Sequence, residues 1–422
     1  TFPYDPTYGD PYNCRERYFI ERIGDDAGWL HAGRPRREAA RLAFRLGLRR
    51  QAVALVAELA TFAEVVATRS AEEAETVMPD QTYLQQAQPS TFGHYLLSFA
   101  HPVLRDAERL VRAADWVDRS PGGAGCVNGS RLLPDRDLVA ELLGFSGVIE
   151  HTRDAMWQTD GLVDLLAVAA DLVSTESKLA EDLEIWDSQE FDFVSLADPY
   201  TRASVLMPQK RNPYALAIVR GATGVLVGRL AGFLAVVKSP SARSDNLIFA
   251  YGEVPRSLDL ARQMTRLMTG VVGTMETHPE RMWASLVAGF SQATDLAEFV
   301  MVRCALDYRT AYLIVGETVR RASRQGLRGL DVTAALLDEV ATERLGRPLG
   351  LVDADLADVL DPRAIVATRT GAGGAAPDVV LAMARSVTEE ASDRRAAAAR
   401  RLSRFDHAEE RLVSQARQAA DG

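Results

Sequence analysis

Apolar residues recur at three- and four-residue spacing over several long stretches of the chain, which is the pattern of amphipathic or buried helices. The pattern predicts five long helices, over residues 38–75, 91–117, 154–183, 212–238 and 257–275. Pro102 is expected to kink or divide the second helix, and Pro240 to end the fourth. Alternating strand patterns are nearly absent, so the predicted fold class is all-α.

The predicted helices are longer than a compact single chain needs. A helix of roughly 25 to 40 residues is about 40 to 60 Å long, and such rods are typical of an elongated bundle. Glycines in the fourth helix recur at spacings of three and four, and we interpret them as a smooth packing face: Gly221, Gly224, Gly228 and Gly232. Beyond residue 278 the helices shorten, and the Ala- and Arg-rich stretch 392–420 is predicted to be a solvated terminal helix.

Composition narrows the possible partners. The 422 residues include 48 Lys+Arg and 58 Asp+Glu, a formal net charge of −10, which argues against a nucleic acid or an anionic membrane as partner. Three distant cysteines and the lack of an apolar leader favour a reduced, cytoplasmic protein. No His or Cys cluster has metal-ligand spacing, so no metal is expected. Lysine is rare, since the chain contains only Lys178, Lys210 and Lys238.

One of these lysines lies in the segment SVLMPQKRNP, residues 204–213. Asn212 is a good N-cap and Pro213 suits the first helical position, so the fourth helix is expected to begin here with its positive dipole end facing the loop. Lys210 lies just ahead of that end. Together these groups could bind a carboxylate or a phosphate. An ordinary surface cap is the alternative interpretation.

The same segment resembles the GSSxMPxKxNP signature of the fumarase/aspartase superfamily. Two further segments resemble the argininosuccinate lyase branch of that superfamily: LHAGRPRRE at 30–38 is similar to LHTGRSRND, and TYLQQAQP at 82–89 is similar to THLQRAQP. Similar segments at 190–194, 293–297 and 373–377 follow in the family's order. The resemblance thus extends from about residue 21 to residue 377. The family's usual N-terminal segment is longer than the corresponding part of this chain.

This resemblance implies a three-domain protein, with a truncated N-terminal helical domain at 1–34, a central long-helix domain at 35–278 and a small C-terminal helical domain at 279–422. It implies a homotetramer with a central core of about 20 helices and active sites built from segments of three subunits. That assembly would explain the long helices. The implied substrate is a small dicarboxylate-type molecule, and no cofactor is implied.

The implied reaction is β-elimination from a succinyl group, in which a base removes a Cβ proton and a nitrogen or oxygen leaving group departs with fumarate as coproduct. Ser204 matches the family's base, and Lys210 would stabilise both its alkoxide and the dianionic intermediate. Asn212 and Thr82 match substrate contacts. Four further residues are candidates for substrate binding: Gln85, Arg36, Arg37 and Arg243.

The chain also departs from the family pattern. Tyr83 replaces a histidine of THLQ, and Ala217 replaces the glutamate that pairs with that histidine. Losing a general acid typically lowers the rate about 10²- to 10⁴-fold, so an active enzyme would need a substitute. Tyr83 is the candidate for this acid because it occupies the position of the histidine. Arg37 stands where the family has a substrate-binding asparagine. Arg243 is the first residue of the segment 243–252, which aligns with a family loop whose tyrosine, glutamine and both lysines are replaced here.

Three interpretations remain open. The chain is a divergent C–N lyase with an altered acid catalyst and substrate, a catalytically impaired homologue with a structural role, or a binding protein that keeps the anion site. We favour the first because Ser204, Lys210, Asn212 and Thr82 are retained together. Lys210 is retained although the chain contains only three lysines. Composition and divergence together suggest a role in specialised metabolism.

Overall fold

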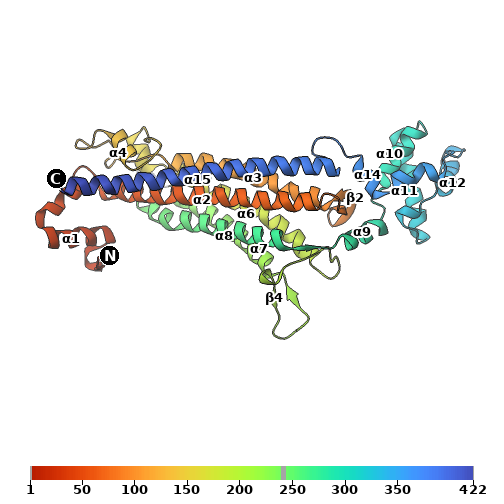
Figure 1. Ribbon diagram of the computed structural model, residues 1–422, viewed down its shortest axis with the longest axis horizontal. Helices are drawn as coiled ribbons and strands as arrows, with labels where there is room; N and C mark the ends of the chain where they lie inside the picture. The colour runs from red at the N-terminus through yellow and green to blue at the C-terminus, as the bar shows by residue number, and fades with distance from the viewer. Residues whose placement is uncertain (1, 239–243, 422) are drawn as a thin grey trace.

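The computed structural model describes residues 2–238 and 244–421. In that part of the chain it contains fifteen α-helices and three two-stranded sheets (Figure 1). The α-helices are α1 (Pro11–Ile23), α2 (Arg36–Glu72), α3 (Phe92–Val117), α4 (Arg136–Leu142), α5 (Thr152–Trp157), α6 (Asp160–Trp186), α7 (Tyr214–Val237), α8 (Ala250–Thr274), α9 (Pro279–Ala288), α10 (Ala293–Arg303), α11 (Tyr308–Arg324), α12 (Ala334–Leu345), α13 (Asp353–Leu360), α14 (Pro362–Ala367) and α15 (Pro377–Asp421).

The sheets are short and antiparallel. They pair β1 (Val77–Thr82) with β2 (Gln85–Thr91), β3 (Val194–Ser195) with β6 (Glu276–Thr277), and β4 (Arg202–Ala203) with β5 (Arg211–Asn212). The described chain also contains short 3₁₀ helices: η1 (Pro6–Tyr8), η2 (Gly24–His31), η3 (Asp198–Tyr200), η4 (Ser244–Phe249) and η5 (Gly329–Asp331).

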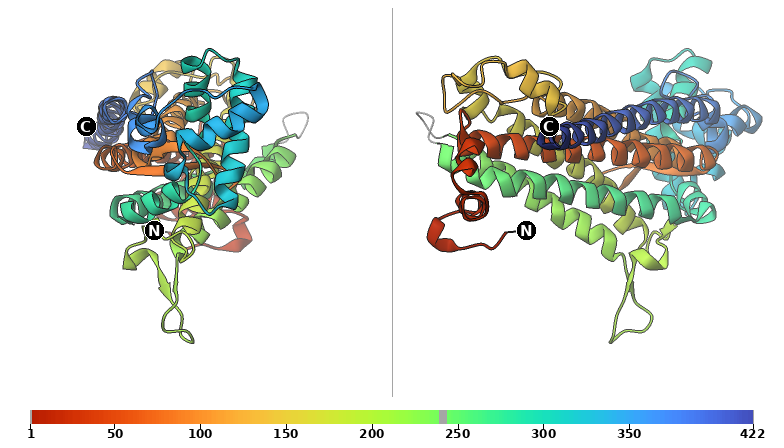
Figure 2. Two further views of the ribbon diagram at one scale, coloured as in Figure 1. Left: turned by 90° about the vertical axis from the view of Figure 1, so that its right-hand side faces the viewer. Right: turned by 60° about the vertical axis from the view of Figure 1, so that its left-hand side comes forward.

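An elongated bundle is formed by the long helices α2, α3, α6, α7, α8 and α15 (Figures 1 and 2). Helix α2 packs against α3, α8 and α15, while α6 packs against α3, α7 and α8. The main hydrophobic core lies between these helices, and its fully buried side chains include Phe62, Phe92, Leu165 and Phe405. The apolar spacing read from the sequence therefore corresponds to buried helix faces in one continuous core.

A second hydrophobic core lies at one end of the bundle, among α10, α11, α12 and α13 (right in Figure 1). Helix α15 begins near this end and runs back along α2, so both chain termini lie at the opposite end of the bundle. The division at residues 34 and 278 remains a prediction. Helix α15 contributes to the main core, although the sequence analysis grouped it with the shorter helices.

The predicted all-α class and long helices are confirmed, with three differences. Pro102 does not divide α3, because buried neighbours on both sides of the proline hold the helix against the core; the predicted kink stays a prediction. The stretch 154–183 forms two helices, α5 and α6, separated at residues 158 and 159. The terminal helix begins fifteen residues before the predicted start, at Pro377, and it is not fully solvated, since Ala391, Ala398 and Phe405 are buried.

Helix α7 leaves much of its apolar surface uncovered. Both α2 and α7 are long and apolar enough to cross a membrane by length and composition alone, but 56% of the apolar window of α2 is buried in the fold, against 28% for α7. A Cβ atom added at any of the four α7 glycines would meet no atom within 4 Å. Large apolar side chains beside these glycines are 39–51% exposed: Ile218, Val225, Val227 and Leu234.

An acidic side chain lies inside the bundle. Glu176 of α6 is 1% exposed, and neither of its carboxyl oxygens has a hydrogen-bond partner in the described chain. Burial raises the pKa of Glu176 from 4.5 to about 8; the Thr265 hydroxyl opposes this shift, and the nearby Asp106 adds to it. Because the folded state holds this proton more tightly than the unfolded state, stability falls as the pH rises from about 5 to about 8.

Replacing Glu176 by glutamine is therefore expected to remove part of this pH dependence. The free energies of unfolding of Glu176→Gln and wild type should be similar near pH 5, and the variant should be more stable by roughly 2 kcal/mol or more at pH 8. Urea unfolding at both pH values measures this. Glu181→Gln, an exposed change on the same helix, is the matched control. An unchanged pH slope in Glu176→Gln would contradict the prediction.

Candidate active site

The β4–β5 hairpin projects from the side of the bundle and carries Ser204 and Lys210 (Figure 1). The Ser204 N–H donates to the Lys210 carbonyl at 3.3 Å, so the two residues face each other where the loop leaves the strands. Between them, the side chains of Val205 and Leu206 are almost fully exposed. The hairpin thus presents a serine, a lysine and an uncovered apolar tip to the surroundings of this chain.

Two backbone donors converge on the Ser204 hydroxyl oxygen. Ser204 Oγ accepts hydrogen bonds from the N–H of Leu206 at 3.3 Å and of Met207 at 3.0 Å. Donors aimed at an oxygen stabilise its ionised form relative to its neutral form. This local turn therefore provides part of the positive environment that a serine base needs, and Lys210 lies in the same loop.

The predicted N-cap role of Asn212 is wrong. Asn212 pairs with Arg202 in the β4–β5 ladder, and its Nδ2 donates to the Arg202 carbonyl at 3.0 Å. The strand pairing holds Asn212 in an extended conformation and directs its amide to the opposite strand. Pro213 takes the N-cap position, so no side chain caps the first N–H groups of α7. Those N–H groups still lie directly behind the hairpin.

A second hairpin, β1–β2, carries Thr82, Tyr83 and Gln85. Its two-residue turn consists of Tyr83 and Leu84, with φ of 54° and 58°, the left-handed values of a type I′ turn. Asparagine and glycine usually occupy such turns, and bulky residues there cost about 1 kcal/mol or more each. The Tyr83 side chain is 99% exposed, and Thr82 and Gln85 are exposed beside it. The turn therefore holds Tyr83 away from its own chain.

A third group lies at the start of α2. Arg36 forms an ion pair with Asp10 and lines an open groove together with Tyr12 and Tyr251. Arg37 follows in the first turn of the helix. Arg243 lies outside the described residues. In the described chain, no cluster of three or more His, Cys, Asp or Glu side chains could hold a metal ion.

The three groups do not meet within one chain. Helix α2 has 37 residues, so at about 1.5 Å per residue its ends are about 55 Å apart; Arg36 is at one end and the β1–β2 hairpin follows the other. The β4–β5 hairpin projects from the side (Figure 1). The structure thus brings the predicted residues together only as three sets: Ser204, Lys210 and Asn212; Thr82, Tyr83 and Gln85; Arg36 and Arg37.

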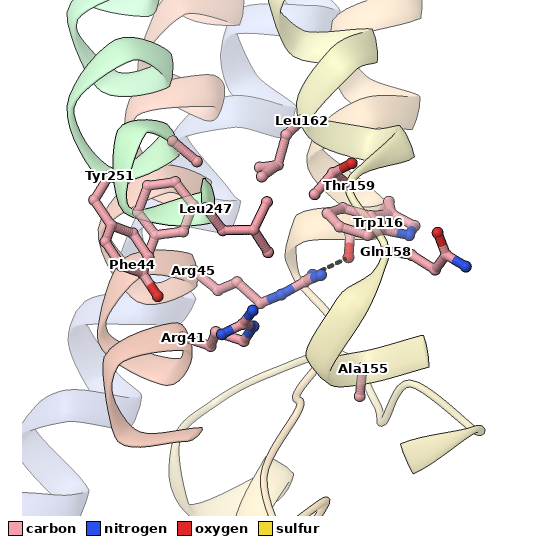
Figure 3. Close-up of a pocket in the computed structure, with 11 residues that line it drawn as sticks. Arg41, Phe44, Arg45, Trp116, Ala155, Gln158, Thr159, Leu162, Leu247 and Tyr251 are labelled. Atoms are coloured by element: carbon pink, nitrogen blue, oxygen red, sulfur yellow. Dashed lines mark hydrogen bonds between the residues drawn. The ribbon is translucent and has the colours of Figure 1, made fainter. Parts of the chain in front are cut away.

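Two buried arginines that the sequence motifs do not single out, Arg41 and Arg45, line a small cavity (Figure 3). Both lie on α2, and both are less than 9% exposed. A signal was present, because Arg41, Arg45 and Arg49 recur every four residues on a helix that also carries a strongly apolar face.

Two family models match the chain. One, described as Lyase, matches residues 9–228, and the other, described as Argininosuccinate lyase C-terminal, matches residues 290–367. The argininosuccinate lyase of Methanococcoides burtonii is 35% identical over 379 residues, which is 89% of this chain and 76% of the relative. That of Methanothrix thermoacetophila is 34% identical over 408 residues, 96% of this chain and 82% of the relative.

Solved structures agree with these matches. A variant of EDDS lyase with bound fumarate superposes with a TM-score of 0.91 at 29% identity, over 96% of this chain and 82% of that one. EDDS lyase in complex with formate gives the same values. The 3-carboxy-cis,cis-muconate lactonizing enzyme from Pseudomonas putida has a TM-score of 0.70 at 21% identity, over 90% of this chain and 81% of that one, and shows likeness of fold alone.

Proposed function

The chain belongs to the argininosuccinate lyase family of C–N lyases, with the all-α fold of the fumarase/aspartase superfamily, and on this premise we propose that it eliminates an amine from a succinyl, aspartate-derived substrate. The resemblance inferred from the sequence motifs is confirmed. The product would be fumarate or a related unsaturated acid. The observation that best supports this reaction is the pair of backbone N–H groups at Ser204 Oγ, in the loop that also carries Lys210.

In the proposed reaction, the Ser204 alkoxide takes a proton from the Cβ atom of the succinyl group. The electron pair of that C–H bond passes into the adjacent carboxylate, giving an aci-carboxylate dianion. Lys210 and the uncapped N–H groups at the start of α7 would stabilise this negative charge. The double bond then forms between Cα and Cβ while the C–N bond breaks, and the electron pair of that bond leaves with the nitrogen.

The leaving nitrogen needs a proton unless it is stable as an anion. We propose Tyr83 as the donor, because its phenol stands where the family has a histidine and the strained turn presents it outwards. The family's glutamate partner for that histidine is Ala217 here, so the proton would come without a charge relay. Since this acid differs from the family's, argininosuccinate itself is expected to be a poor substrate.

We propose that four chains assemble and share their sites. The uncovered apolar face of α7, with its four glycines, is suited to close packing against α7 of other chains. The separation of the three residue sets within one chain supports the same assembly, since a site that uses all of them needs more than one subunit. A cytoplasmic location and a role in specialised metabolism remain predictions.

One observation favours an alternative, a catalytically impaired homologue that keeps a structural or anion-binding role. Both members of the family's histidine–glutamate pair are absent, at Tyr83 and Ala217. A protein freed from turnover could lose them together at little cost. The retention of Lys210 beside Ser204 supports the lyase over this alternative.

The lyase proposal is tested by fumarate release. The assembled protein should produce ultraviolet absorbance and vinyl proton NMR signals of fumarate from at least one N-substituted aspartate. Lys210→Ala should lower kcat/KM by about 10²-fold or more, because it removes a charge-assisted contact made to the dianion. Lys178→Ala, an exposed lysine on α6, should leave the rate unchanged. Equal rates in all three proteins, or no fumarate from any candidate, would support the impaired homologue instead.

A further inference from the structure

A small cavity lies where the start of α2 meets α3, the α5–α6 connection and α8 (Figure 3). It has a volume of about 30 Å³. Its walls are largely apolar, with Phe44, Leu162, Leu247 and Tyr251 among them. None of the candidate active-site residues of the described chain lines it. The guanidinium groups of Arg41 and Arg45 extend from α2 towards the α5–α6 connection.

Arg41 brings a positive charge into this cavity, and no partner for it occurs among the residues that the structure describes. The residue is 8% exposed, and its Nη2 atom is buried without a hydrogen-bond partner. No ion pair or hydrogen bond of Arg41 occurs in the described chain. The nearest carboxylate in sequence, Glu38, accepts hydrogen bonds instead from the N–H groups of Gly123 and Gly125 at 2.9 and 2.7 Å. An unpaired buried charge is costly, which indicates that an anion belongs beside it.

Arg45 adds a second charge one helical turn further along. It donates to the Trp116 carbonyl at 2.9 Å, and its guanidinium carbon lies 3.8 Å from the centroid of the Trp116 ring. Burial, together with the charge of Arg41, lowers the pKa of Arg45 to about 9. The next arginine, Arg49, has a buried carboxylate partner in Asp118 at 2.9 Å. Of these three arginines, Arg41 and Arg45 form no ion pair with a carboxylate among the described residues, although the charges of Asp160 and Asp154 oppose the lowering of the Arg45 pKa.

We propose that this cavity binds the carboxylate group of a small organic acid, with Arg41 donating to its oxygens and Arg45 supplying a second positive charge. The cavity is small, so a flat carboxylate group fits it better than a bulkier tetrahedral phosphate or sulfate. A planar guanidinium matches the geometry of a carboxylate, and the apolar walls suit the carbon attached to it.

The carboxylate could come from two sources. Tyr251 lines both this cavity and the open groove that contains Arg36. A substrate lying in that groove could reach the cavity with a carboxylate on its leaving group, a source that rests on the proposed lyase function. A free monocarboxylate is the other source. The carboxylate site itself does not depend on catalysis.

Titration calorimetry with sodium acetate, at constant ionic strength, tests the site in the assembled protein. Wild type should bind one acetate per chain, and Arg41→Leu should lose at least tenfold in affinity. Arg50→Leu is the matched control, because Arg50 lies on the same helix but is paired with Asp406 and Glu409. Equal affinity in Arg41→Leu, no binding to wild type, or equally strong binding of sulfate would each overturn the proposal.

Thermal unfolding shows whether Arg41→Leu is folded, so that a loss of acetate binding can be attributed to the site. Without acetate, Arg41→Leu should unfold at the same temperature as wild type or higher, because it removes an unpaired buried charge. Acetate should raise the unfolding temperature only where Arg41 is present. If the protein is found to cleave a substrate, the inhibition of that reaction by acetate distinguishes the two sources. Competitive inhibition shows that the cavity binds a carboxylate of the substrate, and non-competitive inhibition shows that it binds a separate free acid. If no substrate is found, the titration still decides the site.

Discussion

Replacing Ser204 by alanine is expected to lower kcat by about 10²- to 10⁴-fold on any substrate that the protein cleaves. The hydroxyl would be lost while Lys210 and the hairpin remain. Because the hydrogen bonds of Ser204 Oγ in the described chain are those from Leu206 and Met207, in an exposed loop, the free energy of unfolding should change by no more than about 1 kcal/mol. KM should change much less than kcat, since the base acts on the proton in the transition state.

The matched control deletes a hydroxyl elsewhere. Ser98 is exposed on α3, and its Oγ donates to the Tyr95 carbonyl at 2.6 Å. Steady-state kinetics should show Ser98→Ala within twofold of wild type. A Ser204→Ala enzyme with the same kcat as wild type would remove Ser204 from the mechanism and leave the family assignment intact.

The sequence predicts the helices of this fold well because their apolar spacing is sustained over many turns. The division between α5 and α6 was not visible, since a break of two residues hardly disturbs a pattern averaged over a long window. The role of Asn212 was misjudged for a different reason. A residue that is a good N-cap is also a good strand partner in a tight hairpin, and only the pairing with Arg202 decides between them.

The candidate site shows a similar limit. Motifs identify Ser204, Lys210 and Thr82 one by one, but no motif says that a helix of 37 residues separates the start of α2 from the β1–β2 hairpin. The sequence also does not reveal that Arg41 lacks a partner among the described residues, because this depends on how α3 and α5 fold around it. Local pattern reveals chemistry, whereas the tertiary arrangement decides which groups can act together.

A mixture of two inactive variants is expected to recover activity if the sites are shared. Ser204→Ala and Thr82→Ala each damage a different hairpin, and each alone should have little activity. When the chains are unfolded together in equal amounts and reassembled, a site that takes Ser204 from one subunit and Thr82 from another has both intact in about one case in four. The mixture should therefore recover about a quarter of the wild-type kcat, measured per site.

The control for this recovery mixes two variants of the same hairpin. Ser204 and Lys210 are joined by a backbone hydrogen bond in one loop, so both must come from the same subunit. A mixture of Ser204→Ala and Lys210→Ala should then stay inactive, because no loop contains both intact residues. Recovery in this control, or none with Thr82→Ala, would contradict the shared site. Recovery with Ser204→Ala and Thr82→Ala, but not with Ser204→Ala and Lys210→Ala, would show that one active site combines hairpins from different subunits. Catalysis would then depend on assembly.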